Sequence, residues 1–213
     1  MNSKIEINKP IIILVEGKDD EQFLSSFINE LFPNSISDCN IINLQGKTNF
    51  KSQISALSKT PGFRENVKVL LIFLDADDSL TNTFRSITNT LKELNLPDPV
   101  KPGELISDKQ IKVGVYIFPN SKDNGTLEDL LIEMIKETDN KSLECIYRYI
   151  DCIKKVQNIS KLKHESKSIL YSYFAIKQEP SDDPCTSIKR KALEFNCKSI
   201  EKLRKFFEEA IKK

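Results

Sequence analysis

Carboxylates follow two apolar runs of the sequence, and they are the residues best suited to chemistry. Glu16 directly follows the run Ile11–Val15, and Asp75 and Asp77 follow the run Val69–Leu74. On an extended chain, residues two apart point the same way, so Asp75 and Asp77 can converge just past the end of a strand. Carboxylates held that close repel one another unless a cation lies between them, and Mg2+ or Mn2+ prefers such oxygen ligands. The sequence therefore predicts a divalent metal site.

The elements that must position these carboxylates are strands at the centre of a parallel sheet. The run Val69–Leu74 has six consecutive apolar residues, which are too few for a typical helix and too many for a half-exposed strand. It therefore indicates a strand that is covered on both faces. Hydrophobic spacing and Gly or Pro punctuation predict further strands and helices between them. We expect strands at 9–15, 41–44, 69–74 and 111–118, helices at 19–31, 50–58, 84–94 and 127–137, and a loop over 97–109.

From about residue 141 onward the pattern changes to amphipathic helices with no strand between them. These are expected at 142–157, 161–176, 186–195 and 199–212. Alternating strands and helices followed by helices alone predict an open, mainly parallel, four-stranded α/β (Rossmann-like) sheet with a C-terminal α-helical extension. We expect a metal-binding α/β domain over residues 1–138 and a basic helical extension, packed on it, over 139–213.

The same edge of the predicted sheet gathers additional carboxylates. The C-terminal ends of parallel strands meet at one edge, so Glu16 can lie beside the aspartates that follow the third strand. Asp20 lies on the first turn of the next helix and could reach the same pocket or a second metal, although Asp19 is equally close in sequence. Glu128 and Asp129 open the helix after the fourth strand and are further candidates, but either would also stabilise a helix N-terminus without a metal.

Composition and charge restrict the class of protein and the class of partner. The chain has 213 residues, of which 39% are hydrophobic and 30% are charged. Its apolar runs are far shorter than the roughly 20 residues of a membrane helix, and no signal peptide precedes the first strand, so we expect a cytoplasmic protein that does not enter a membrane. Five cysteines without a C-x-x-C pair argue against a disulfide framework and a structural zinc site.

The net charge of +1 conceals an asymmetry along the chain. Residues 1–153 carry 17 Lys or Arg against 23 Asp or Glu, whereas residues 154–213 carry 15 against 8. An acidic metal-binding part joined to a basic part suits an enzyme that acts on a polyanion, because the basic part supplies phosphate contacts. Lys-rich, solvated surface helices would give the same asymmetry without any such role.

Two motifs resemble the Toprim domain, the magnesium-binding module of topoisomerases, primases and OLD-family nucleases. They are IIILVEGKDD, which carries the Glu-Gly that this family has after its first strand, and LIFLDADD, which carries the Asp-x-Asp after its third strand. The resemblance covers roughly residues 9–130. It implies that Glu16, Asp75 and Asp77 occupy metal and acid/base positions.

Two further stretches resemble small stand-alone Toprim-like proteins that are related to the OLD nucleases. They are Gly46-Lys47, after the second strand, and Gly125-Thr126-Leu127-Glu128, after the fourth. In the nuclease branch additional acidic residues hold a second metal, which the resemblance assigns to Asp20 and Glu128. That branch also uses a lysine near the site, for which Lys47 and Lys122 are the candidates.

The activity that the resemblance implies is Mg2+- or Mn2+-dependent phosphodiester hydrolysis of DNA or RNA, with Glu16, Asp75, Asp77 and a lysine such as Lys47 as catalytic residues. The chain has no space for the nucleophilic-tyrosine domain of a topoisomerase or for the accessory parts of a primase. OLD proteins carry an ATPase ahead of the Toprim module. Here the first strand comes at once, so we expect an ATPase to be a separate partner or to be absent.

Two alternatives fit the same residues. LIFLDADDSL resembles the nucleophile motif of haloacid-dehalogenase-type phosphatases, in which Asp75 would be phosphorylated and Asp77 would be the acid/base. That motif usually has Gly where Asp78 stands, and it usually occupies the first strand of its domain. The other alternative is a non-catalytic Toprim-like module that binds a nucleotide or a partner, and such a module should tolerate Glu16→Gln and Asp75→Asn.

Overall fold

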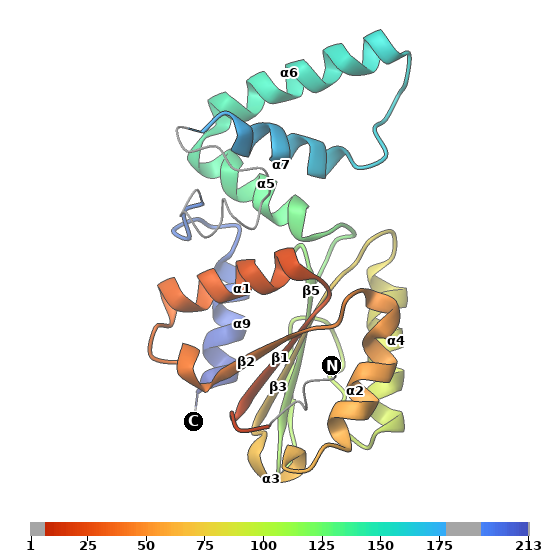
Figure 1. Ribbon diagram of the computed structural model, residues 1–213, viewed down its shortest axis with the longest axis vertical. Coiled ribbons are helices and arrows are strands. Elements are labelled where there is room, and N and C mark those ends of the chain that lie inside the picture. Colours follow the sequence, from red (N-terminus) through yellow and green to blue (C-terminus); the bar gives the residue numbers. More distant parts are fainter. Residues whose placement is uncertain (1–6, 178–192, 213) are drawn as a thin grey trace, which may run out of the picture.

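A computed structural model of the protein describes residues 7–177 and 193–212 (Figure 1). The strands are β1 (Ile11–Val15), β2 (Cys39–Asn43), β3 (Val69–Asp75), β4 (Leu105–Ser107) and β5 (Lys112–Phe118). The α-helices are α1 (Lys18–Leu31), α2 (Phe50–Ser58), α3 (Phe63–Asn66), α4 (Leu80–Glu93), α5 (Leu127–Thr138), α6 (Asn140–Gln157), α7 (Glu165–Ala175) and α9 (Glu201–Ile211). Two short 3-10 helices, η1 (Ile36–Asp38) and η2 (Lys47–Asn49), flank β2.

The strands form one open, mostly parallel sheet in the order β2-β1-β3-β5-β4. The first four strands in this order run parallel, and β4 pairs with β5 antiparallel. Val15 pairs with Phe73, and Asp75 pairs with Phe118. The C-terminal ends of β1, β3 and β5 therefore lie at the same edge, which is where the sequence placed its carboxylates.

The sheet has five strands, so the expectation of four was wrong. The additional strand, β4, lies in the stretch that was expected to be a loop, and it contains only three residues. Two of these are exposed, and a run this short at a sheet edge has no hydrophobic alternation by which a strand is recognised. The strand pairs with β5 on one side only.

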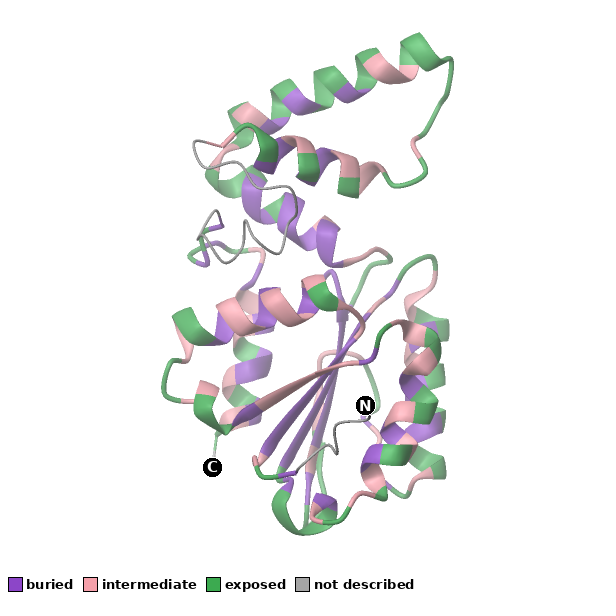
Figure 2. Cartoon of the chain, in the orientation of Figure 1, coloured by how far each residue is buried: buried purple, intermediate pink, exposed green. Residues whose placement is uncertain are grey.

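The central strands are buried because helices cover both faces of the sheet (Figure 2). Ile11, Ile13 and Val15 of β1 point to the face that α1 and α9 cover. Ile12 and Leu14 point to the face that α2 and α4 cover. The two faces form separate hydrophobic cores, which explains why the strand reads as a continuous apolar run instead of an alternating one.

Helix α9 packs directly against the sheet, beside α1 (Figure 1). The ring of Phe206 lies 5.4 Å from that of Tyr116 and 5.9 Å from that of Phe73, centroid to centroid. Gly114 of β5 allows this close approach, because a Cβ there would lie 2.7 Å from Phe206 and 2.5 Å from Leu105. The C-terminal helix thus covers the same face of the sheet as α1, the first helix of the chain. The helix that was expected at 186–195 lies mostly outside the described residues.

Helices α5, α6 and α7 extend past the C-terminal edge of the sheet (Figure 1). Helix α5 begins at that edge, and α6 and α7 pack on it and on each other through Leu131, Ile146, Ile150, Leu170 and Phe174, all buried. Among the described residues, no helix is long and apolar enough to span a membrane.

Candidate metal and active site

A small pocket of about 140 Å³ lies at the C-terminal edge of the sheet. Glu16 reaches it from the end of β1, Asp20 from α1, Asp75 from the end of β3, Glu128 from the start of α5, and Lys167 from α7. Gly17, Lys18, Asp19 and Leu127 complete its lining. We call it the carboxylate pocket. Four of the five carboxylates that the sequence suggested for metal binding therefore face one space.

Glu16 holds the central position of this site. Its Oε2 atom is buried and has no hydrogen-bond partner among the described residues. Desolvation and the negative charge of Asp77 raise the pKa of Glu16, while the positive charge of Lys47 lowers it. Main-chain hydrogen bonds from Asp75 and Lys47 also lower the pKa of Glu16, so only part of its carboxylate is unsatisfied, and a cation or a donor placed at Oε2 would stabilise it.

Asp20 is buried and Asp75 is partly buried in this pocket, and each accepts a hydrogen bond from one main-chain donor. The amide of Leu127 donates to Asp75 Oδ1 at 2.9 Å, and the amide of Gly17 donates to Asp20 Oδ2 at 2.8 Å. Burial and the neighbouring carboxylates raise the pKa of Asp75 to about 9 and that of Asp20 to about 7. At neutral pH a proton on these carboxyls is therefore more favourable than it would be on a solvent-exposed aspartate.

The structure distinguishes the two aspartates that the sequence left open on α1. Both Asp19 and Asp20 line the pocket. Asp20 is the buried one, with an exposed fraction of 6%, and its bond to the Gly17 amide closes the first turn of α1. Its orientation is therefore fixed by the start of the helix.

Asp77 does not line the carboxylate pocket. The chain leaves its extended conformation after β3, and the φ of Asp77 is +50°, so the alternation that should have aligned it with Asp75 no longer applies. Its main chain exchanges two hydrogen bonds with Gly125, at 2.8 and 2.9 Å. Its half-exposed side chain forms an ion pair with Lys47 at 2.7 Å.

Lys47 connects the two parts of the site. Its Nζ donates to the carbonyl oxygen of Asp75 at 2.8 Å and to Asp77 Oδ2 at 2.7 Å. Its charge also reaches Glu16, because it lowers the pKa of that carboxyl. The other candidate lysine, Lys122, lies in the loop after β5, where its charge acts on Lys202. The geometry therefore favours Lys47 as the lysine beside the site.

Glu128 and Asp129 are adjacent in sequence but have different surroundings. Glu128 is buried, with an exposed fraction of 8%, and its Oε1 lies 3.2 Å from Lys167 Nζ. Asp129 accepts hydrogen bonds from the Thr126 amide at 2.8 Å and from the Ser166 hydroxyl at 2.7 Å. Asp129 therefore caps α5 and fastens α7 to it, whereas Glu128 faces the pocket.

Lys167 was missed by the sequence analysis. It follows Glu128 by 39 residues and belongs to a lysine-rich stretch in which no local pattern sets it apart. Its pKa is raised, mainly by the charge of Glu128 and also by that of Asp19. The only signal in the sequence was the general excess of basic residues after residue 153, which does not say which lysine reaches the pocket.

The donors of the pocket suit a hard divalent cation. The acidic side chains that line it offer carboxylate oxygen, and burial together with neighbouring carboxylates raises the pKa values of Asp20 and Asp75. Among the described residues, however, no three His, Cys, Asp or Glu side chains lie close enough together to enclose an ion.

A second, larger cavity of about 1000 Å³ lies on the other side of α5. Asp129, Glu133 and Glu137 line it from α5, and residues of the loop after β5, of α6 and of α7 complete it. Its charges are largely satisfied: Glu165 binds Lys154 at 2.6 Å, and Glu137 accepts from the amides of Lys198 and Ser199 at 2.6 and 2.7 Å. We call it the α5–α7 cavity.

Comparison with known families identifies the chain over nearly all of its length. Residues 10–212 match the family described as "Protein of unknown function (DUF3226)". The chain belongs to this family. The match runs from β1 to α9, so DUF3226 includes the sheet, the carboxylate pocket and the helices beyond it. No curated protein matches the chain.

Among solved structures, the C-terminal region of the OLD protein of Xanthomonas campestris pv. campestris is similar to this DUF3226 chain. The identity is 17% and the TM-score is 0.39, over 86% of this chain and 80% of that one. A TM-score of this size does not establish a common fold, so the function is argued below from the residues of the chain.

Proposed function

We propose that this protein is a Mg2+- or Mn2+-dependent nuclease that hydrolyses phosphodiester bonds of DNA or RNA through a Toprim-like carboxylate site. One observation carries the proposal: Glu16, Asp20, Asp75 and Glu128 face one small pocket from four elements, and the acidic side chains that line it outnumber the two lysines, Lys18 and Lys167. The raised pKa values and the unpartnered Glu16 oxygen are the electrostatic signature of that arrangement. Such clustered, perturbed carboxylates are typical of functional sites.

The four carboxylates of the pocket would hold the cation, or two cations, from the ends of β1 and β3 and from the first turns of α1 and α5. A divalent cation supplies Lewis-acid stabilisation of phosphoryl charge and a nucleophilic hydroxide at neutral pH. Asp75 ends the central strand and accepts a hydrogen bond from the Leu127 amide, which fixes its orientation. The sequence motif and the sheet edge together support the Toprim-like assignment.

The lysines have roles that do not depend on the number of cations. Lys167 is half exposed at the rim of the pocket and paired with Glu128, so its ammonium can contact a phosphate of the substrate. Lys47 bridges the main chain of Asp75 and the side chain of Asp77, and it thereby holds the turn after β3 in place. Glu16, whose pKa is raised, can exchange a proton with water or with the leaving oxygen.

A cleavage assay tests the proposal. The purified protein should cleave plasmid, linear DNA or RNA in Mg2+ or Mn2+ and stop when EDTA is added. Glu16→Gln should reduce the rate by roughly 100-fold or more, whereas Glu133→Gln, on the face of α5 that lines the other cavity, should cleave like the wild type. Absence of cleavage by the wild type, or equal cleavage by Glu16→Gln, would contradict the proposal.

The same preparations separate the nuclease from the two alternatives. Hydrolysis of a simple phosphomonoester that Asp75→Asn abolishes, with nucleic acid left intact, would favour a phosphatase that uses Asp75 as its nucleophile. A module that only binds a nucleotide or a partner should keep its binding in both Glu16→Gln and Asp75→Asn. A possible separate ATPase partner can be sought by adding ATPase-containing fractions to the cleavage assay.

A further inference from the structure

Helix α7 has one exposed face that carries a lysine and a tyrosine beside the carboxylate pocket. Its buried residues Ile169, Leu170, Tyr173 and Phe174 pack toward α5 and α6. On another face, His164, at the N-cap position, is exposed, and Lys167 and Tyr171 follow it three and seven residues later. At 3.6 residues per turn, these positions form one stripe along the helix.

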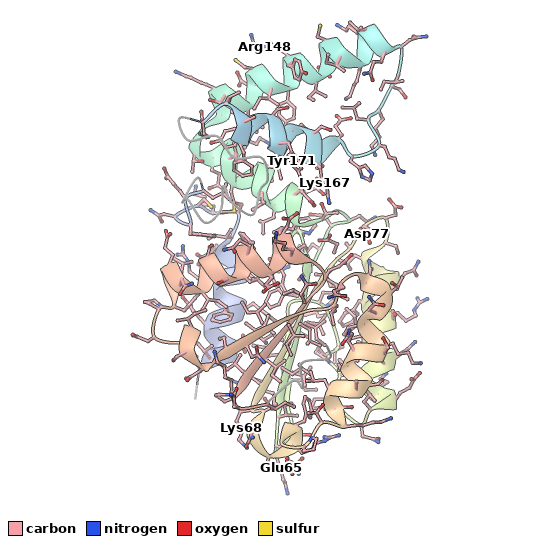
Figure 3. All side chains as sticks on the ribbon, in the orientation of Figure 1. Glu65, Lys68, Asp77, Arg148, Lys167 and Tyr171 are labelled. Atoms are coloured by element: carbon pink, nitrogen blue, oxygen red, sulfur yellow. The ribbon has the colours of Figure 1, made fainter. Side chains whose placement is uncertain are left out.

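Tyr171 lies close to the catalytic edge of the molecule. It follows Lys167 by one helical turn, about 6 Å along the helix axis, and Lys167 contacts Glu128 at 3.2 Å. The phenol of Tyr171 is near enough to influence the pKa of Lys167. Figure 3 labels both residues on α7, between that helix and the sheet end where Asp77 is labelled.

The exposure of Tyr171 is not explained by packing. Its relative exposure is 44%, compared with 2% for Tyr173 on the same helix, whose ring lies 5.6 Å from that of Phe174. Tyr149 on α6 is also exposed, at 55%, so what sets the Tyr171 ring apart is its place on the helix face that carries Lys167. Beside a lysine and a reactive pocket, the same ring is a platform on which a flat, partly apolar group can stack.

We propose that this stripe is the track of a single-stranded nucleic acid, in which an unpaired base stacks on Tyr171 while Lys167 contacts a phosphate at the rim of the carboxylate pocket. The inference rests on the proposed function and adds the substrate class to it. Lysines that follow a phosphate backbone and aromatic rings that take up bases are the combination by which proteins bind single strands. A base has its face free for a ring only when it is unstacked from its neighbours.

The absence of tryptophan from the sequence allows a direct test. Tyr171→Trp introduces a single tryptophan, and Tyr149→Trp on α6, where the exposed fraction of Tyr149 is 55%, is the matched control. Each variant is titrated in Ca2+, used to limit cleavage, with an unpaired 12-nucleotide strand and with a blunt 12-base-pair duplex. The emission of Tyr171→Trp should be quenched by the single strand and much less by the duplex, and that of Tyr149→Trp should not change.

Affinity measurements on two further variants complete the test. Tyr171→Ala should bind the unpaired strand about 5- to 150-fold more weakly, the loss that removal of one stacked base gives. Tyr171→Phe keeps the ring and loses the hydroxyl, so it should bind like the wild type. Weaker binding by Tyr171→Phe would mean that the hydroxyl, and not the stacked ring, is what matters. Circular dichroism of each variant checks that it is folded.

The outcomes separate this inference from the function on which it rests. Wild-type protein that binds and cleaves nucleic acid while Tyr171→Trp stays unquenched and Tyr171→Ala keeps its affinity would overturn the stacking role alone. Equal binding of duplex and unpaired strand would also overturn it. Wild-type protein that binds neither strand and cleaves nothing would contradict the proposed function and this inference together.

Discussion

Two cavities lie on opposite sides of α5, and they differ in size and in how their charges are satisfied. The α5–α7 cavity is the larger, at about 1000 Å³, but three of its acidic side chains, Asp129, Glu137 and Glu165, are held by Lys154, by main-chain amides or by a hydroxyl group. The carboxylate pocket has only about 140 Å³, yet five carboxylates line it, and the Oε2 atom of Glu16 has no hydrogen-bond partner among the described residues. The comparison teaches that unsatisfied charge, more than volume, marks the place where this protein should bind an ion.

Adjacent residues at the start of α5 show the contrast most clearly. Successive residues of a helix are about 100° apart, so Glu128 and Asp129 face different cavities. Asp129 receives two strong hydrogen bonds and acts as a structural group, while Glu128 is buried opposite a lysine at the pocket. Substitutions on the two sides should therefore have different consequences, which can be ranked by size.

The largest expected difference is in catalysis. Asp75→Asn removes a charge from the centre of the carboxylate pocket and should reduce metal-dependent cleavage by roughly 100- to 10,000-fold. Glu137→Gln, on the other side of α5, should leave the cleavage rate within about threefold of the wild type, because Glu137 contacts the start of α9 and not the pocket. Similar rates for the two variants, measured on the same substrate in Mn2+, would remove the distinction between the cavities.

The next effect is on stability as a function of pH. Burial and mutual repulsion raise the pKa of Asp20 to about 7 and that of Asp75 to about 9, above the roughly 4 of an unfolded chain. The folded state therefore binds more protons than the unfolded state between about pH 4 and pH 9, and the free energy of unfolding contributed by these groups falls as the pH rises through that range.

In EDTA, the Tm of the wild type should therefore decrease more from pH 5 to pH 8 than the Tm of Asp75→Asn, because the variant lacks one of the two titrating carboxyls. Mg2+ or Mn2+ should restore more of the wild-type Tm at pH 8 than at pH 5, because the cation replaces the missing protons. A metal effect of equal size at both pH values would argue against binding by these carboxylates.

An intermediate effect is expected from the lysines of the two cavities. Lys167→Ala should weaken binding of nucleic acid by roughly 10-fold and reduce the slope of log affinity against log salt by about 1, as loss of one phosphate contact does. Lys154→Ala removes the ion pair with Glu165 beside the α5–α7 cavity and should change neither quantity. Fluorescence anisotropy at three or four salt concentrations distinguishes these results.

The smallest effect should come from Asp129. Asp129→Ala removes the cap of α5 and the bond to Ser166, so it should lower the free energy of unfolding by about 1 kcal/mol. Cleavage at a temperature where the protein remains folded should be unchanged, in contrast to Asp75→Asn. A large loss of activity without a loss of stability would place Asp129 in the site and blur the contrast with Glu128.

The sequence predicted the sheet edge better than the arrangement around it. Glu16 and Asp75 each end a buried strand, and parallel strands must bring those ends together, so their meeting followed from local patterns. Asp77 does not line the pocket beside Asp75, because its own backbone is left-handed, and the rule that residues two apart share a face holds only for extended chain. Lys167 reaches the pocket through the packing of α7 on α5, a contact between distant segments that no local pattern encodes.

The fold shows the same division between local and long-range information. The long helices and buried strands were predicted to within a few residues, because their hydrophobic periods extend over many positions. The three-residue strand β4 was missed because so short a segment has no period. The return of α9 to the sheet depends on Phe206 meeting Gly114, which only the folded chain reveals.

The most direct test of the account is a crystal structure of the protein soaked with Mn2+, with data collected at a wavelength at which manganese scatters anomalously. The account predicts an anomalous peak in the carboxylate pocket, bound by Asp75 and Glu16, and its loss in Asp75→Asn. A peak in the α5–α7 cavity alone, or no peak at either place in crystals that hold the cation elsewhere, would contradict it.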